Sequence, residues 1–338
     1  MLIKQDFCLS PFNTFGVEIM ARRLSIITSE SDLQVLYNAG ELKESKVLVL
    51  SKGSNILFTN HFEGLVLLNQ IWGKKIIKEE EDHVFLEASS GEFWPSLVEF
   101  TVENGWCGLE NMTDIPGKVG AAPIQNIGAY GVELKDVLVS LNAFNLFTGE
   151  FVKFTNSDCE FSYRSSIFKT TLKNRYFITS VLFKLSKKTK LNLSYMPLAE
   201  SFANVDINEV TITDVSKKVA EIRRSKLPNP DKLKNAGSFF KNPIVTNEML
   251  NVIKSKYPTI PSNSINQDYQ KLHAAWLIEQ CGFKGKRKGN VGVYEKHALI
   301  IVNHDKATGN EILEFAKSIQ KSVFDKFGVQ LEFEVNVV

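Results

Sequence analysis

The N-terminal part of the chain combines short apolar strands with one amphipathic helix. Val17 to Ile27 is mainly apolar and predicts a strand. Ser31 can cap a helix whose apolar residues recur at helical spacing. Val47 to Leu50 predicts a short buried strand, which runs directly into the polar loop Ser51 to Asn55. These elements together predict a small α/β unit over residues 13–71.

From residue 72 to about residue 186 the pattern indicates a meander of strands with one helix. Apolar residues at helical spacing predict a helix over Phe93 to Asn104, with its aromatic side chains in the core. Thr148-Gly149 separates two alternating runs and predicts a hairpin. Tyr176 to Leu185 alternates again, so we expect it to return to the same sheet.

The last third of the chain is predicted to form amphipathic helices and a final strand. Thr213 can cap a helix that Pro228 and Pro230 stop, and these prolines mark a domain boundary. A long amphipathic helix is predicted over Asn310 to Phe327. Leu331 to Val337 alternates between apolar and polar residues and predicts a terminal strand.

Composition indicates an ordinary globular protein of two or three domains. Hydrophobic residues make up 43% and charged residues 23% of the 338 positions. A formal net charge of +2 is too small to indicate nucleic acid or an anionic membrane as the main partner. No apolar run approaches the roughly 18 residues of a membrane helix, and the N-terminal residues lack a signal-peptide core. Cys8, Cys107, Cys159 and Cys281 show no metal spacing and indicate reduced thiols.

The most informative stretch is GLENMTDIPGKVGAAPIQNIGAYG, residues 108–131, which holds five glycines among small and short polar residues. Glycine tolerates positive φ and lets another surface approach the backbone closely. Successive exposed N–H groups form a concave anion site. Stretches of this composition also serve as tight connections and nothing more. The residues alone leave both interpretations open.

Three further segments carry polar groups with two possible roles each. The loop Ser51 to Asn55 follows a strand, so it could bind phosphate or form a plain turn. Arg164 could clamp a carboxylate with two parallel hydrogen bonds, or be a surface charge. Arg223 and Lys226 lie one helical turn apart and suit either an anionic ligand or the negative end of their helix.

The order of residues in the glycine-rich stretch, GLE-x-M-x-x-IPG-x-VG-x-AP-x-QNIGAYG-x-E, resembles the signature of the UDP-N-acetylenolpyruvoylglucosamine reductase family. YRSSIFK, RRSKLP, NAGSFFKNP and LEFEV resemble further motifs of that family, so the resemblance extends over residues 13–335. It implies an α+β protein with the FAD-binding fold of the vanillyl-alcohol-oxidase (PCMH-type) class. The implied parts are FAD-binding subdomains over 1–71 (with the terminal strand 329–338) and 72–228, and a C-terminal α/β substrate domain over 229–328.

The resemblance also implies an activity. Members of the family reduce the enolpyruvyl group of UDP-N-acetylenolpyruvoylglucosamine to give UDP-N-acetylmuramate for bacterial peptidoglycan. FAD and NADPH are the implied cofactors, with hydride passing from NADPH through FAD to the substrate. The resemblance further implies a cytoplasmic enzyme, expected to be a monomer, that binds a small UDP-sugar and needs no metal.

The FAD-binding residues that the resemblance implies come from the loop after the strand Val47 to Leu50, the glycine-rich stretch and the segment before Arg164. They are Gly53, Ser54, Asn55, Ile115, Pro116, Gly117, Gly120, Ala121, Gln125, Asn126, Gly128, Ala129, Tyr130, Gly131 and Tyr163. Two positions depart from the family pattern. Ala121 stands where glycine or serine is common, and Lys52 stands where a further glycine is frequent.

The implied catalytic residues come from three distant parts of the chain. Arg164 matches the arginine that meets the substrate's carboxylate, and Ser238 matches the proton donor. Glu334 matches the catalytic glutamate, with Glu332 as the weaker candidate beside it. A free hydroxyl is a poor acid, so Ser238 is expected to belong to a hydrogen-bonded relay.

The substrate-binding residues that the resemblance implies are Tyr195, Arg223, Lys226, Asn242 and Lys284. Tyr195 matches a tyrosine on the mobile loop of the family's first subclass, and a purely structural tyrosine is the alternative. Lys284 belongs to a basic cluster that could also be a solvated face. Lys226 or Asn242 could take part in the relay behind Ser238. Asn263 stands where some members carry a second tyrosine, and Tyr269 lies six positions later.

Two rival functions remain at this stage. An FAD oxidase of the vanillyl-alcohol-oxidase class would share the FAD fold but lack the contexts of Ser238 and Glu334. A catalytically inactive flavin- or nucleotide-binding protein would not need Arg164, Ser238 and Glu334 together. A Rossmann dehydrogenase is disfavoured because no GxGxxG follows any predicted strand.

Overall fold

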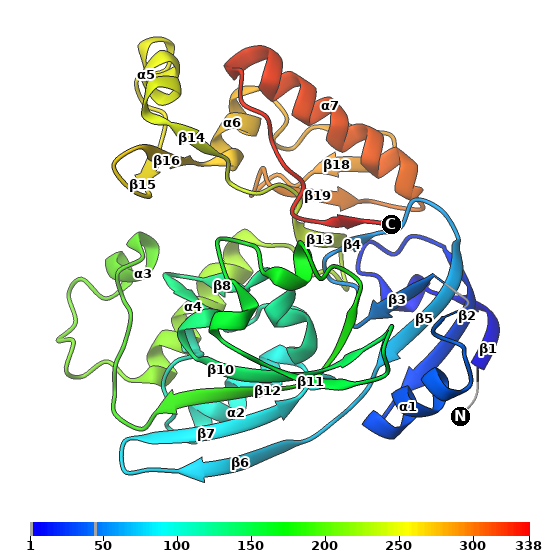
Figure 1. Cartoon of the computed structure of the whole chain (residues 1–338). Helices are drawn as coiled ribbons and strands as arrows, with labels where there is room; N and C mark the ends of the chain where they lie inside the picture. The colour runs from blue at the N-terminus through cyan, green and yellow to red at the C-terminus, as the bar shows by residue number, and fades with distance from the viewer. Residues whose placement is uncertain (1–2, 44–45) are drawn as a thin grey trace. The chain divides into compact units, whose positions relative to one another are not determined.

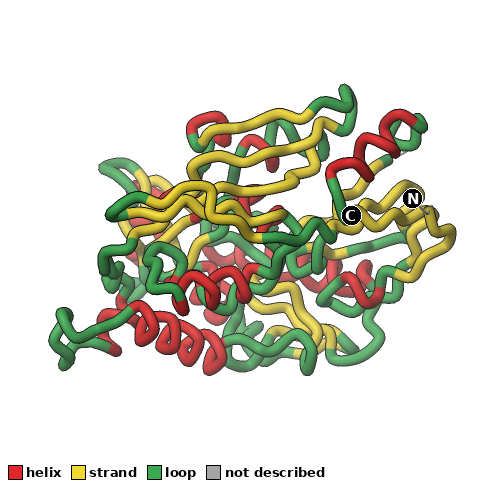
Figure 2. The backbone as a smooth tube through the Cα atoms, turned by 90° about the horizontal axis from the view of Figure 1, so that it is seen from below, coloured by secondary structure: helices red, strands yellow, loops and turns green. Residues whose placement is uncertain are grey.

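The computed structural model describes residues 3–43 and 46–338, and the chain divides into two compact units. Unit 1 comprises Met1–Phe7, Ala21–Lys52 and Phe62–Ser225. Unit 2 comprises Cys8–Met20, Gly53–His61 and Lys226–Val338. Helices and strands are both well represented along the chain, as Figures 1 and 2 show. The division of the first unit into two subdomains stays a prediction.

The first sheet of unit 1 has the strand order β1-β2-β5-β3. Its strands are β1 (Ile3–Cys8), β2 (Met20–Ile27), β3 (Val47–Leu50) and β5 (Phe62–Asn69), and the helix α1 (Glu30–Asn38) follows β2. β2 and β3 each pair with β5 in parallel. Parallel strands joined through a helix form an α/β unit, so the predicted α/β character of this part is confirmed.

The second sheet of unit 1 is antiparallel and has the order β11-β10-β12-β7-β6. Its strands are β6 (Lys74–Glu79), β7 (His83–Ser89), β10 (Leu138–Asn145), β11 (Phe151–Thr155) and β12 (Tyr176–Ser186). The predicted hairpin at Thr148-Gly149 joins β10 to β11. The predicted return of the segment after Tyr176 to this sheet is also confirmed, because β12 is its central strand.

The remaining elements of unit 1 are mostly short. They are α2 (Trp94–Glu103), η2 (Glu110–Met112), η3 (Val119–Gln125), β8 (Gly128–Ala129), β9 (Val132–Glu133), η4 (Leu134–Asp136), η5 (Ser157–Cys159), η6 (Ile167–Lys169), α3 (Met196–Ser201) and α4 (Ile212–Lys226). The last residue of α4 belongs to unit 2.

Apolar clusters hold unit 1 together, and two of them involve its sheets. One packs α2 against the antiparallel sheet, with Trp94 and Phe183 in ring contact at 6.2 Å between centroids. The other joins Leu33 and Leu36 of α1 to Phe144 of β10. Burial of such side chains stabilises the fold by roughly 1.5–3 kcal/mol each.

Unit 2 contains two antiparallel sheets and a short parallel pair. The orders are β13-β19-β18-β17, β14-β16-β15 and β20-β4. The strands are β4 (Ile56–Leu57), β13 (Lys234–Ser238), β14 (Ile244–Thr246), β15 (Ser262–Ser264), β16 (Tyr269–Leu272), β17 (Arg287–Lys288), β18 (Val291–Val293), β19 (Ile300–Asn303) and β20 (Asn336–Val337). The helices are η1 (Ser10–Phe12), α5 (Asn247–Lys256), α6 (Ala274–Gln280) and α7 (Gly309–Phe327).

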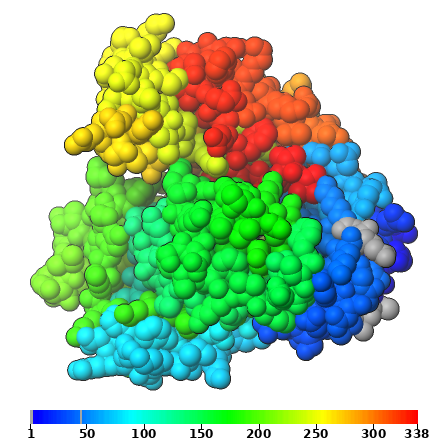
Figure 3. Space-filling view, viewed as in Figure 1, coloured from blue at the N-terminus to red at the C-terminus, as the bar shows by residue number. Residues whose placement is uncertain are grey.

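The long helix α7 confirms the amphipathic prediction. Ile312, Phe315, Ile319 and Val323 are buried on one face. The opposite face carries exposed polar residues, and this part of the chain, drawn in orange to red, forms surface in Figure 3. Thr308 caps the helix through a reciprocal capping box with Glu311.

Four local predictions are wrong. Ser29, not Ser31, caps α1, because Ser29 and Asp32 form a capping box there. Thr211, rather than Thr213, accepts the Asp214 amide at the start of α4. The predicted terminal strand is reduced to β20 and an isolated bridge at Phe333. The other alternating residues of this segment lie in irregular backbone.

The fourth error concerns Phe93, which was expected in the core with the other aromatic side chains of its helix. Phe93 is 40% exposed, although Trp94 is buried as expected. Phe93 precedes the first turn of α2 and packs beside Trp72 instead.

Candidate active site and cofactor cradle

The glycine-rich stretch lies alongside residues 89–94 and is hydrogen-bonded to their backbone. The amides of Val119 and Gly120 donate to the carbonyls of Glu92 and Ser90 at 2.9 Å. A Cβ on Gly120 would lie 2.5 Å from the Cβ of Ser90, so only glycine fits there without a shift. Gly117 has a φ of +135°, which glycine tolerates. These constraints explain two of the glycines that the sequence pattern singled out.

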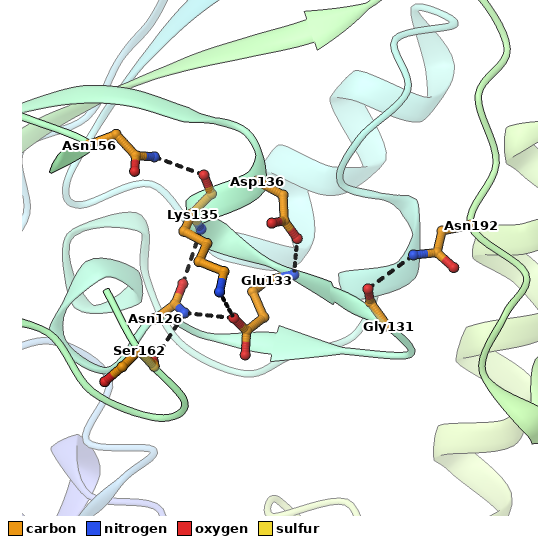
Figure 4. Close-up of polar contacts among 8 residues, drawn as sticks. All are labelled: Asn126, Gly131, Glu133, Lys135, Asp136, Asn156, Ser162 and Asn192. Atoms are coloured by element: carbon orange, nitrogen blue, oxygen red, sulfur yellow. Dashed lines mark hydrogen bonds and ion pairs between the residues drawn. The ribbon is translucent and has the colours of Figure 1, made fainter. Parts of the chain in front are cut away.

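Asn126 is the central polar residue of this stretch (Figure 4). Its buried amide donates to Glu133 Oε2 at 3.0 Å and to the Ser162 carbonyl at 3.2 Å, and it accepts from the Lys135 amide at 3.0 Å. Asn126 itself has a left-handed φ of +45°. Asparagine tolerates this conformation better than most residues, so it can bend the backbone and tie it to two other segments.

The turn that carries Tyr163 and Arg164 is docked onto the glycine-rich stretch. Ser162 and Ser165 exchange two backbone hydrogen bonds of 3.1 Å, which places Tyr163 and Arg164 at the tip of the turn. The Ser166 hydroxyl donates to the Ile124 carbonyl at 2.8 Å. Arg164 has a φ of +53°. A strained backbone in a bulky residue persists where its surroundings fix it, and such residues cluster at functional sites.

Arg223 of α4 is a second cation near this turn. Its Nε is buried and has no hydrogen-bond partner among the described residues. Burial lowers the pKa of Arg223, and the neighbouring Arg164 lowers it further, while Tyr130 and Asp114 oppose the shift. Asp114 is already paired with Arg224 at 2.9 Å. A guanidinium nitrogen that is buried without a described partner suits an anionic ligand.

Tyr195 packs against the glycine-rich stretch in unit 1. Its ring meets that of Tyr130 edge to face, with 5.2 Å between centroids. The segment before it is held by Asn192, which donates to the Gly131 carbonyl at 3.0 Å (Figure 4). Buried Asn111 donates to the carbonyls of both Tyr130 and Asn192 at 2.8 Å. Tyr195 remains 47% exposed, so its hydroxyl-bearing side chain is accessible to a ligand.

Lys118 is a buried cation that the sequence analysis did not single out. Its Nζ donates to the Asn69 carbonyl at 2.7 Å and lies 4.6 Å from the centroid of the Trp72 ring. Burial lowers its pKa to about 8, and the nearby Glu92 carboxylate only partly opposes this shift. A lysine within a stretch of few charges was the one sequence signal of this position.

Lys118 makes stability depend on pH. Its pKa of about 8 lies below the ordinary 10.5, so the unfolded chain binds more protons between these values. The free energy of unfolding therefore rises with pH across this window, by about 3 kcal/mol in all. We expect Lys118→Met to remove this rise, as measured by the thermal midpoint from about pH 7 to about pH 10. The exposed Lys75→Met serves as control, and parallel curves for Lys118→Met and the wild type would contradict the assignment.

In unit 2, the loop after β3 is held against the N-terminal segment. Thr14 donates its amide to the Gly53 carbonyl at 3.1 Å. Gly53 has a φ of +64°, and a Cβ there would lie 2.0 Å from the Phe12 carbonyl oxygen. Asn55 donates its side-chain amide to the Glu334 carbonyl at 3.3 Å. The predicted phosphate loop and the predicted catalytic glutamate are therefore neighbours along their backbones.

Ser238 lies on the strand beside Glu334. The Glu334 amide donates to the Phe239 carbonyl at 2.8 Å, and Phe240 forms a bridge with Phe333. Ser238 pairs with Ile300 of β19 after an irregularity in the β13–β19 ladder. Unit 2 thus brings Ser238, Glu334 and Asn55 together from three separate parts of the sequence.

Glu332 differs from Glu334 in its surroundings. Glu332 is exposed and pairs with Lys241 at 2.8 Å. Glu334 is 9% exposed. Glu334 donates its amide to the Phe239 carbonyl, next to Ser238, whereas the Glu332 side chain is engaged with Lys241, which favours Glu334 for the catalytic role.

The other expected substrate residues of unit 2 are partly engaged. Asn242 accepts the Ala274 amide at 2.9 Å through its side-chain oxygen, which leaves its NH₂ group to face a ligand. Lys284 pairs with Glu279 at 2.9 Å. Asn263, where some family members have a tyrosine, contacts His273 at 2.7 Å. Tyr269 is 45% exposed on β16.

The two units therefore each hold a cluster of expected site residues. Unit 1 brings together Arg164, Arg223, Tyr130 and Tyr195, along with the glycine-rich stretch. Unit 2 brings together the Gly53 loop, Ser238 and Glu334. The contacts described above lie within one unit or the other.

The residues of unit 1 fit a phosphate-bearing cofactor. The hydroxyl of Ser51, at the end of β3, is buried and has no partner among the described residues. The Asn111 side-chain oxygen is likewise buried without a described partner. Orphaned buried polar atoms are costly unless a ligand or water meets them. Together with the bent glycine-rich backbone, they indicate a built ligand cradle.

Comparison with known proteins identifies related sequences. Residues 229–338 match the family model described as the C-terminal domain of UDP-N-acetylenolpyruvoylglucosamine reductase. Residues 22–155 match the model described as an FAD binding domain. A UDP-N-acetylenolpyruvoylglucosamine reductase from Flavobacterium johnsoniae is 46% identical over 339 residues and covers 100% of each chain. One from Amoebophilus asiaticus is 43% identical over 338 residues, again with 100% of each chain covered.

A solved structure supports the fold. The reductase of the same name from Thermus caldophilus has a TM-score of 0.70 and covers 99% of each chain at 23% identity. At this identity the likeness establishes the fold alone. It confirms the predicted α+β FAD-binding fold with its C-terminal domain. Among the described residues, no helix is both long and apolar enough to cross a lipid bilayer.

Proposed function

The chain belongs to the UDP-N-acetylenolpyruvoylglucosamine reductase family, and from this premise we propose that it reduces the enolpyruvyl group of UDP-N-acetylenolpyruvoylglucosamine with NADPH. The product is UDP-N-acetylmuramate, a precursor of peptidoglycan. The observation that carries the proposal is full-length identity of 46% to a reductase of that name, with the FAD binding domain matched over residues 22–155. When bound, FAD would supply the hydride-transfer chemistry between NADPH and the substrate.

The residues that would hold FAD lie in the cradle described above. The N–H groups and bends of the glycine-rich stretch suit a diphosphate, with Asn126 fixing the shape of that stretch. Gly53, Ser54 and Asn55 supply a second phosphate loop, and Tyr163 lies at the tip of the docked turn. Support comes from the left-handed residues and orphaned polar atoms of these segments.

Arg164 and Glu334 would stabilise the charge that develops on the substrate. Adding hydride to the vinyl group loads negative charge onto the adjoining carboxylate. A guanidinium can meet that carboxylate with two parallel hydrogen bonds, and a fixed cation costs no reorganisation during the reaction. Glu334 can assist if it carries a proton or can otherwise donate a hydrogen bond to the developing charge.

Ser238 would deliver the proton that completes the reduction. The carbon next to the carboxylate must gain a proton after hydride addition to its neighbour. Ser238 lies on the strand beside Glu334, and a proton donor on a rigid strand is held in place for this transfer. Lys226 or Asn242 is the proposed partner in its relay.

The substrate's diphosphate and sugar would meet the remaining residues. Tyr195, Arg223, Lys226, Asn242 and Lys284 supply hydroxyl, amide and cationic groups. These groups are the types that recognise phosphate oxygens. We also propose that the protein is cytoplasmic, because NADPH and UDP-sugars are soluble cytoplasmic metabolites. We propose in addition that it acts as a monomer without nucleic-acid or membrane partners.

Steady-state assay of the purified protein tests the function. We expect NADPH to be consumed in proportion to added UDP-N-acetylenolpyruvoylglucosamine, with UDP-N-acetylmuramate identified by mass. UDP-N-acetylglucosamine, which lacks the enolpyruvyl group, serves as the control and should support no consumption. NADPH oxidation that depends on oxygen and not on the enolpyruvyl substrate would favour the oxidase alternative.

A further inference from the structure

His297 lies beside the strand that carries Ser238. It belongs to the turn between β18 and β19, which is closed by a hydrogen bond of 2.8 Å from the Tyr294 amide to the Ile300 carbonyl. Directly after this turn, the chain pairs with the strand of Ser238, because the Phe239 amide donates to the Leu299 carbonyl at 2.8 Å. His297 is therefore tied through a short piece of backbone to the neighbour of the proposed proton donor.

The hydrogen bonding of His297 defines its tautomer. The Leu299 amide donates to Nδ1 at 3.3 Å, so Nδ1 acts as an acceptor and carries no proton in the neutral ring. The proton of the neutral imidazole then lies on Nε2. No hydrogen bond to Nε2 is present among the described residues, so this donor is left for a ligand.

The charged groups that act on His297 are cations from two other elements. Lys226 ends α4, and Lys284 lies in the loop before β17. That loop packs against the His297 turn, since a Cβ on Gly285 would lie 3.9 Å from the Cα of Glu295. Glu295 and Lys296, on the turn itself, are exposed, and Glu279 pairs with Lys284. Burial first, and then the two lysines, lower the pKa of His297.

The turn of His297 packs against the loop that carries Lys284, and an imidazole beside a lysine suits a multiply charged anion. The lysines repel a proton from the ring while the site is empty, whereas an anion between them would attract one. The substrate of the proposed function carries such an anion in its diphosphate. Lys226 and Lys284 are already the residues of unit 2 expected to meet it.

We propose that His297 is a third diphosphate-binding residue on unit 2, with Nε2–H as the donor, and that it makes substrate affinity depend on pH. The inference rests on the proposed function, because it takes the ligand to be a UDP-sugar. Above neutral pH the ring binds as a neutral donor. Below neutral pH the bound anion draws a second proton onto the ring, so substrate binding becomes tighter as pH falls.

Isothermal titration of the FAD-loaded protein with UDP-N-acetylenolpyruvoylglucosamine, without NADPH, tests this inference. The diphosphate of this ligand is a diester and does not titrate near neutral pH, and no turnover occurs without the reductant. Titrations in two buffers of different ionisation enthalpy report the protons taken up. We expect proton uptake on binding at about pH 6 and none at about pH 8. The Kd should be about three- to tenfold lower at pH 6 than at pH 8.

Variants separate His297 from the other histidines. His297→Gln retains an amide donor but cannot titrate, so we expect it to lose the uptake and the pH dependence of Kd. His297→Asn provides a second neutral donor in case the first variant folds poorly. His304→Gln is the matched control, because His304 is exposed at the end of the same sheet, and it should behave like the wild type.

The outcomes distinguish this inference from the function on which it rests. Proton uptake that persists unchanged in His297→Gln, or a wild-type Kd that does not vary with pH, would overturn the role of His297 while leaving the reductase assignment intact. Failure of the substrate to bind at any pH would overturn both.

Discussion

Replacing Ser238 with alanine should slow the half-reaction with enolpyruvyl substrate by about 10²- to 10⁴-fold, the usual contribution of a positioned proton donor. The half-reaction with NADPH should keep its wild-type rate, because no proton from Ser238 is needed there. Stopped-flow measurement of the visible absorption of bound FAD follows each half-reaction separately.

Ser255→Ala is the control for this change. Ser255 is an exposed serine of α5 in the same unit, whose hydroxyl donates to the Val252 carbonyl at 2.7 Å. Its loss should leave both half-reactions unchanged. If Ser238→Ala slowed both half-reactions equally, Ser238 would have a structural role, and the proposed proton transfer would have to come from another group.

Replacing Gly53 with alanine should weaken FAD binding and destabilise unit 2. A left-handed conformation costs a residue with a Cβ roughly 1–2 kcal/mol. The new Cβ would also overlap the Phe12 carbonyl oxygen at 2.0 Å, which belongs to backbone and cannot move aside by changing rotamer. Overpacking of this kind adds typically 1–3 kcal/mol. Thermal unfolding and equilibrium dialysis of FAD measure the two effects.

Gly289→Ala is the control that separates the steric overlap of the new Cβ from the cost of the left-handed backbone conformation. Gly289 has a φ of +58°, close to that of Gly53, but a Cβ there meets nothing within 4 Å. We expect Gly289→Ala to show the conformational cost alone and to retain wild-type affinity for FAD. Equal destabilisation by the two changes, with FAD affinity unchanged in both, would mean that the Gly53 loop does not form part of the cradle.

Regular elements were the most predictable part of the fold. α2, α7, β3 and the β10–β11 hairpin follow from apolar spacing and turn residues, because their side chains bury one face. The predicted helix starts were wrong where two nearby polar residues could each cap the helix. Ser29 and Ser31 both suit a helix start, and only the reciprocal bond with Asp32 selects Ser29.

The terminal segment shows a different limit. Leu331 to Val337 alternates as a strand would, yet only β20 pairs as a strand, with β4, and Phe333 forms an isolated bridge with Phe240. A segment forms a strand only if it pairs with a partner that can be far away in the sequence. The alternation of apolar and polar residues does not identify that partner. Its position beside the Phe239 backbone was accessible only through resemblance to the family.

The candidate site was predictable to a similar degree. Motifs pointed to Arg164, Ser238 and Glu334, but each residue alone has an ordinary structural interpretation. Two residues were missed, because Lys118 stands at a variable position of the glycine-rich motif and His297 lies outside the motifs. The pKa of Lys118 and that of His297 are set by burial and by distant charges, which no local pattern records.

The central claim is that this chain carries hydride from NADPH to an enolpyruvyl UDP-sugar through FAD. Anaerobic titration of the purified protein, followed by visible absorption, tests it most directly. The account predicts a yellow protein that NADPH bleaches and that UDP-N-acetylenolpyruvoylglucosamine restores to its full colour, with one UDP-N-acetylmuramate formed per FAD. A protein without bound flavin, or one whose bleached form regains its colour only when oxygen is admitted, would contradict it.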